Sequence, residues 1–248
     1  MNRIISYISL LSGIFLMFGI FSCTKENEET LFEAVGDVYY FSKIVENKKV
    51  TALAFYAYGN KAIISAMVSL PNDEELSLEG SLENSFTVFN EPNESDFSND
   101  YPEEGIYTFD LLSKDEDNLQ SSDELKIENL EIPEITEIRY ESNDFSYDVE
   151  WNSDDLVDAY LIKMLDSEGE IIFTSNLLDT GESSYILIYG DAGAWETEIV
   201  IGSTYTIQLF AFIYDAEADP ADFGTATSPM FNLQEMSICD VNFIWDEN

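Results

Sequence analysis

The spacing of apolar residues along the chain favours short β-strands and argues against long helices. Phe145, Tyr147, Val149 and Trp151 alternate with polar residues, so in an extended segment their side chains would share one face. No stretch longer than about 12 residues keeps apolar side chains at helical spacing. We therefore expect a core built from strands that are joined by turns.

The predicted strands are short runs rich in β-branched and aromatic residues, bounded by turn residues. Gly59 and Asn60 predict a tight hairpin between two of them, because both residues tolerate positive φ. A second turn is expected at 166–169. The predicted strands are 38–43, 50–58, 62–69, 85–89, 105–112, 145–151, 159–165, 170–174 and 204–214.

A change of composition near the middle of the chain predicts two domains. Residues 90–104 are polar and acidic and are expected to form a long exposed loop. A boundary follows near 128–133, where Pro133 restricts the preceding residue to extended conformations. The predicted fold class is all-β, with two consecutive antiparallel β-sandwich (Ig-like) domains at 35–128 and 129–248.

The second half carries aromatic and small residues at the spacing of a known sandwich family. The residues concerned are Trp151, Tyr160, Gly202, Tyr205 and Ala211. In this spacing the segment 133–233 resembles the fibronectin type III fold. The resemblance implies that Tyr205 hydrogen-bonds a nearby backbone carbonyl, and it implies nothing about activity.

The amino terminus predicts an export signal with a lipid attachment site. The apolar run 4–21 follows Arg3 and ends at Ser22 and Cys23. This arrangement resembles the lipobox of bacterial lipoproteins. It implies cleavage after residue 22 and acylation of Cys23, including palmitate, with a polar tether over 23–34. The alternative is an uncleaved membrane anchor, since the run is about long enough to cross a bilayer.

The lipid predicts where the chain resides. Acyl chains on Cys23 would anchor it in a membrane, and the acidic tether is similar to export signals of surface lipoproteins. We expect the outer membrane with exposure at the cell surface, and the periplasmic face is the alternative. Once Cys23 is acylated, only Cys239 remains, so an intrachain disulfide is excluded.

Charge and composition exclude several classes of function. The chain has 50 Asp and Glu against 10 Lys and Arg, with a formal net charge of −40. Such a surface repels nucleic acid. The sequence has no histidine, which excludes Ser-His-Asp and Cys-His mechanisms. It also has no phosphate-binding glycine loop and no CxxC pair. We therefore expect a chain that is not an enzyme.

One loop carries carboxylates at alternating positions. Asp215, Glu217 and Asp219 are followed by Asp222, and alternating acids in a loop can converge oxygen ligands on calcium. The alternative is an acidic loop that is simply solvated. Calcium is the only cofactor that the sequence suggests.

Two aromatic residues are candidates for ligand binding. Trp195 and Tyr189 flank a segment that contains Gly190 and Gly193, and exposed rings can stack on sugars or anchor a protein partner. The alternative is that Trp195 covers the open end of the sandwich.

Together these features predict a non-catalytic, lipid-anchored binding or adhesion module at the cell surface, accessory to glycan capture. The alternative is a structural subunit of an envelope protein complex, which would bind its partner through a sandwich edge or the Trp195 segment.

Overall fold

The computed structural model describes residues 31–80, 86–141, 146–189, 195–216, 218 and 232–246. In these residues the regular structure is β-strand apart from one short 3-10 helix, so the all-β class is confirmed. Among the same residues, no helix is long and apolar enough to cross a membrane. The elements are β1 (Ala34–Val45), β2 (Lys48–Gly59), β3 (Ile63–Ser69), β4 (Glu75–Gly80), β5 (Thr87–Asn90), η1 (Glu94–Asp96), β6 (Gly105–Ser113), β7 (Asn118–Leu125), β8 (Ile135–Glu141), β9 (Ser146–Trp151), β10 (Ala159–Leu165), β11 (Ile171–Thr174), β12 (Leu178–Asp179), β13 (Ser184–Ile188), β14 (Thr204–Tyr214) and β15 (Leu233–Ile244).

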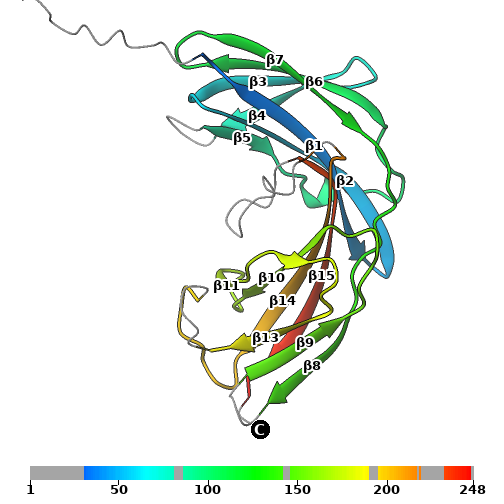
Figure 1. The fold of residues 1–248 in the computed structure, drawn as a ribbon, viewed down its shortest axis with the longest axis vertical. Coiled ribbons are helices and arrows are strands. Elements are labelled where there is room, and N and C mark those ends of the chain that lie inside the picture. Colours follow the sequence, from blue (N-terminus) through cyan, green and yellow to red (C-terminus); the bar gives the residue numbers. More distant parts are fainter. Residues whose placement is uncertain are drawn as a thin grey trace, which may run out of the picture. The chain divides into compact units, whose positions relative to one another are not determined.

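The first half wraps strands β1 to β7 around one hydrophobic core (Figure 1). Their order in the sheet is β1-β2-β5-β4-β3-β6-β7. Side chains from β1 and β6, including Val38, Tyr40 and Phe109, are completely buried there. The other edge of β1 faces β7, where Ser121 Oγ accepts the backbone N–H of Gly36 at 3.2 Å. Side chains of β7 thus satisfy backbone donors of β1 that have no strand partner.

The turns of the first half differ in one place from the sequence prediction. The expected hairpin at Gly59 and Asn60 is wrong, because β2 pairs with β1 and β5 whereas β3 pairs with β4 and β6. The turn instead carries the chain from one layer of the sandwich to the other. The tight hairpin lies between β1 and β2, where Glu46 and Asn47 have φ of 50° and 63°, as a primed turn requires.

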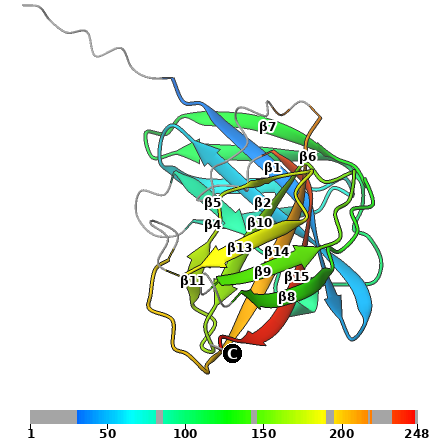
Figure 2. The ribbon, with the colours of Figure 1, turned by 60° about the horizontal axis from the view of Figure 1, so that its bottom comes forward.

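The second half is a sandwich of two layers (Figures 1 and 2). Strands β13-β9-β8 form one sheet, and β11-β10-β14-β15 belong to the other. The alternation predicted for β9 is confirmed, since Tyr147, Val149 and Trp151 are buried in the core between the layers. The Tyr205 hydroxyl donates to the carbonyl of Val200 at 3.4 Å and accepts its N–H at 2.8 Å, which confirms the expected tyrosine–backbone bond.

One strand pair departs from the antiparallel pattern and continues the sheet across both halves. β1 pairs with β15 in parallel, with Tyr40 opposite Glu235. Behind this pair a third cluster combines Tyr39 of β1 with Phe212 of β14 and Met236 of β15. The domain limits 35–128 and 129–248 stay a prediction, and the first and second halves each have a core of their own.

Candidate functional site

The structure describes only some of the residues predicted to carry function. Cys23 lies outside the described residues, so its acylation stays a prediction. Of the acidic loop, Asp215 is described, and Glu217, Asp219 and Asp222 are not. The loop as a calcium site therefore also stays a prediction.

Trp195 and Tyr189 lie together at the edge of the second sandwich. The Trp195 indole N–H donates to the carbonyl of Ile188 at 2.9 Å, and its ring centroid lies 4.8 Å from that of Phe173. Trp195 is half-buried against the core, whereas Tyr189 is 45% exposed and meets it edge-on at 5.6 Å. The arrangement leaves Tyr189 as the more accessible ring, and a binding role for the pair stays a prediction.

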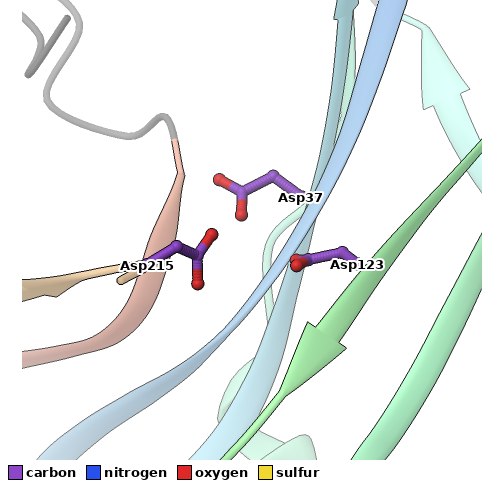
Figure 3. Close-up of side chains that lie close together, drawn as sticks. All are labelled: Asp37, Asp123 and Asp215. Carbon is purple, nitrogen blue, oxygen red and sulfur yellow. The ribbon is translucent and has the colours of Figure 1, made fainter. Parts of the chain in front are cut away.

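A different set of acids converges on a pocket that the sequence did not indicate. Asp37 belongs to β1, Asp123 to β7, and Asp215 directly follows β14. One carboxylate oxygen of each lies within 4.8 Å of the other two (Figure 3). We call these three residues the carboxylate cluster. They line a cavity of about 840 Å³ whose wall also carries Asp158 and Glu128.

Local structure holds each member of the carboxylate cluster in place. Asp123 Oδ2 accepts the backbone N–H of Val38 at 2.8 Å. Asp37 Oδ2 accepts the backbone N–H of Leu233 at 3.4 Å. Asp215 Oδ1 accepts a hydrogen bond from the side-chain amide of Gln234. Neighbouring strands thus fix the three carboxylates before any ligand binds.

Asp37 is the most constrained of the three. Its side chain is 1% exposed, and its Oδ1 has no hydrogen-bond partner in the described part of the chain. Burial, together with the charges of Asp123 and Asp215, raises the pKa of Asp37 well above its usual value. Burial also raises the pKa of Asp123 to about 6. Each carboxylate resists ionisation because low-dielectric surroundings and like charges disfavour the anion.

Positive charge does not balance these two acids. Among the described residues, Asp37 and Asp123 form no ion pair with lysine or arginine. Lys126 lines the same cavity, and its ammonium pairs with Glu124 at 2.7 Å. The chemistry available in the cavity is therefore that of hard oxygen ligands, which bind cations such as calcium.

Sequence reasoning missed the carboxylate cluster, although one signal was present. Asp37 stands in an apolar strand between Gly36 and Val38, and charged residues are rarely buried without a partner. The other two members come from distant strands, so no local spacing connects them to Asp37. Only Asp215 was among the residues predicted to bind calcium, and among the described residues it lies beside Asp37 and Asp123.

Comparisons with known proteins return structural similarity alone. No protein-family model matches the chain, and no curated protein matches it. A two-domain fibronectin type III segment from chicken tenascin is 10% identical, with a TM-score of 0.30, covering 86% of this chain and 99% of that one.

Two other solved structures are also similar. A tetra-tandem repeat from the extending region of a large adhesion protein is 9% identical, with a TM-score of 0.25, and a biofilm-associated protein domain is 14% identical, with a TM-score of 0.24. Each alignment covers 86% of this chain, but 50% and 30% of those chains. TM-scores this low carry no argument about function.

Proposed function

We propose that the chain is a lipid-anchored, non-catalytic binding module at the bacterial cell surface. The observation that carries the proposal is Cys23, which follows Ser22 directly at the end of the apolar run 4–21. A thioether-linked diacylglycerol with an amide-linked acyl chain supplies two anchoring signals, which is enough for stable attachment. The remaining chain is then an extracellular β-sandwich scaffold.

The residues of this scaffold favour a binding role over a catalytic one. The whole sequence has no histidine, which is the residue that most often activates a serine or cysteine nucleophile. The accessible ring of Tyr189, which meets Trp195, supports stacking on a sugar. Glycan capture is therefore the binding role that we favour.

Lipidation of Cys23 is tested by labelling cells with a radioactive or clickable fatty acid. The full chain is expected to take up label and to be digested by protease added to intact cells. The variant Cys23→Ala is expected to lose the label and to keep its signal segment, which a shift in mass reveals. Labelling of the Cys23→Ala chain would refute this site, and protection from protease in intact cells would place the chain on the periplasmic face.

Glycan capture is tested by an array screen of the detergent-solubilised full chain. The affinity for the glycan is expected to fall at least about tenfold in Tyr189→Ala, because this variant loses about one stacking interaction. The matched control is Ile106→Ala on β6, which removes an exposed apolar side chain from the other half. Absence of any glycan ligand at micromolar affinity would contradict the proposal.

A second candidate is a structural subunit of an envelope complex. The observation that favours it is β13, which among the described strands pairs with β9 alone and ends its sheet. On this strand Ile186 and Ile188 are 55% and 37% exposed, and an open edge with apolar side chains can accept a partner strand. Crosslinking from position 186 in intact cells would then give a single stoichiometric protein product.

A further inference from the structure

We propose that the carboxylate cluster binds one calcium ion, held by Asp37, Asp123 and Asp215. The site shares Asp215 with the acidic loop that the sequence suggested but takes its other two ligands from distant strands, and it does not depend on the lipid anchor. Its three ligands come from β1, from β7 and from the residue after β14, so the bound ion would join the first half of the chain to the second. Figure 3 shows the three side chains converging on one space.

The spacing of the oxygens fits a calcium ion. Ligand oxygens lie about 2.4 Å from calcium, so two ligands on opposite sides of the ion are about 4.8 Å apart. The three carboxylate oxygens lie within 4.8 Å of one another, so small adjustments of the side chains would bring all three into contact with one ion. Magnesium keeps several of its waters and is usually held by one or two carboxylates, so a set of three protein carboxylates favours calcium.

A second, independent observation points to a ligand at this position. Asp37 is 1% exposed, and its Oδ1 lacks a hydrogen-bond partner among the described residues. Native proteins rarely leave a buried carboxylate oxygen unsatisfied, because the loss of hydration is costly. The oxygen belongs to a carboxylate that faces Asp215 (Figure 3), so a cation between the two would satisfy it.

The electrostatic balance supports a cation rather than a neutral ligand. Asp37 and Asp123 have no lysine or arginine ion-pair partner within the described ranges, and the chain has five acidic residues for each basic one. A divalent ion would neutralise two of the three negative charges, and its own charge would attract the carboxylates strongly. The cavity of about 840 Å³ has room for the waters that complete a coordination of six to eight oxygens.

The cluster also has neighbours that a bound ion would stabilise. Gln234 of β15 donates to Asp215 and also to the carbonyl of Glu124 at 3.3 Å, next to Asp123. An ion on the carboxylates would therefore act on the same junction of β7, β14 and β15 that Gln234 bridges. We expect its main effect to be a rise in stability, as for any ligand that binds only the folded state.

The test uses the full chain in non-ionic detergent after removal of metals with a chelator. Calcium at 100 times its dissociation constant is expected to raise the melting temperature by about 5 °C or more. The dissociation constant is expected on the order of 10⁻⁴ M, as for extracellular calcium modules. An unchanged melting temperature at millimolar calcium would overturn the proposal, and an equal response to magnesium would overturn the assignment of calcium.

Matched variants locate the ion. Asp37→Asn and Asp123→Asn are each expected to abolish the calcium response while leaving the metal-free protein folded, because each removes a carboxylate that burial disfavours. Asp155→Asn is the control, since its exposed side chain lies outside the cluster. Retention of the full response in both cluster variants would overturn the site.

The double variant Asp219→Asn/Asp222→Asn separates this site from the acidic loop. This double variant is expected to keep the calcium response. If the double variant lost the response while Asp37→Asn kept it, the ion would be assigned to the loop instead. Terbium luminescence gives a second readout, because Tyr214 lines the same cavity and can sensitise a bound lanthanide. Calcium is expected to displace terbium from the wild-type chain, and Asp37→Asn is expected to show no sensitised signal.

Discussion

The buried carboxylate of Glu235 accepts a 2.7 Å hydrogen bond from the backbone N–H of Leu130. Its other oxygen accepts the backbone N–H groups of Glu128 at 2.6 Å and of Asn129 at 3.0 Å. Glu235 is 1% exposed and lies on β15. One side chain of the last strand therefore fixes the segment that connects the two halves of the chain.

Replacement of Glu235 tests this relationship. Glu235→Ala leaves three backbone donors without an acceptor, of which that of Leu130 is buried, and is expected to lower the free energy of unfolding by about 2–3 kcal/mol. Glu235→Gln retains one acceptor oxygen and is expected to cost about half as much. The measurement is urea unfolding followed by circular dichroism, with the exposed turn variant Glu168→Gln as control. A loss below about 1 kcal/mol in Glu235→Ala would show that water replaces the carboxylate.

The bond between Tyr205 and Val200 predicts a second stability effect. Tyr205→Phe removes the hydroxyl that bonds both the N–H and the carbonyl of Val200, while the ring stays in the core. A loss of about 1–3 kcal/mol is expected, because the N–H is left unpaired. Tyr189→Phe removes an exposed hydroxyl and is the control. Equal stability of the two variants would contradict a structural role for the Tyr205 hydroxyl.

Gly36 predicts a steric effect beside the carboxylate cluster. A Cβ built on Gly36 would come within 2.1 Å of the Phe109 ring, which is completely buried. Gly36→Ala is therefore expected to destabilise the chain by about 2–3 kcal/mol through overpacking. Gly181→Ala is the control, since nothing lies within 4 Å of its added Cβ. Restoration of stability by Gly36→Ala combined with Phe109→Leu would identify the clash as the cause.

The Cys239 thiol predicts a dependence on pH. Burial raises the pKa of Cys239 above its usual value, so at pH 8 the folded chain holds less thiolate than the unfolded chain. In a Cys23→Ala background, where Cys239 is the only thiol, reaction with a disulfide reagent is expected to be about tenfold slower in the folded state. The free energy of unfolding is expected to fall as the pH rises above the ordinary thiol pKa, because the folded state then binds more protons. Equal rates in folded and urea-unfolded protein would contradict the prediction.

Local pattern was enough to predict two of the strongly buried strands with their exact bounds, but it missed β15, whose first six residues are buried. Residues 159–165 and 204–214 were predicted with the bounds that β10 and β14 have, because both runs are rich in residues that pack in a sandwich core. β7 was missed, since its sequence Asn118–Leu125 is polar and its residues alternate between exposed and half-buried until the buried Leu125. An edge strand of this kind is specified by its neighbour β6, not by its own composition.

Pairing across the chain could not be predicted from local pattern. The hairpin predicted at Gly59 was wrong because turn residues predict that the chain reverses direction. They do not indicate whether the two flanking strands pair in one sheet. The carboxylate cluster depends on three strands brought together by the pairing of β1 with β15 and by the approach of β7 to β1. Asp37 alone carried a signal, as a charged residue within a buried strand.

The parallel pairing of β1 with β15 has a consequence for the timing of folding. Synthesis begins at the amino terminus, so β1 emerges before the residues that pair with Tyr40 to Lys43. Until Leu233–Ile244 follows, that edge of β1 is open to other strands. Contacts between the ends of a chain form slowly because a long loop must close. Among the described strands, β1 therefore keeps this edge unpaired until β15 has been synthesised.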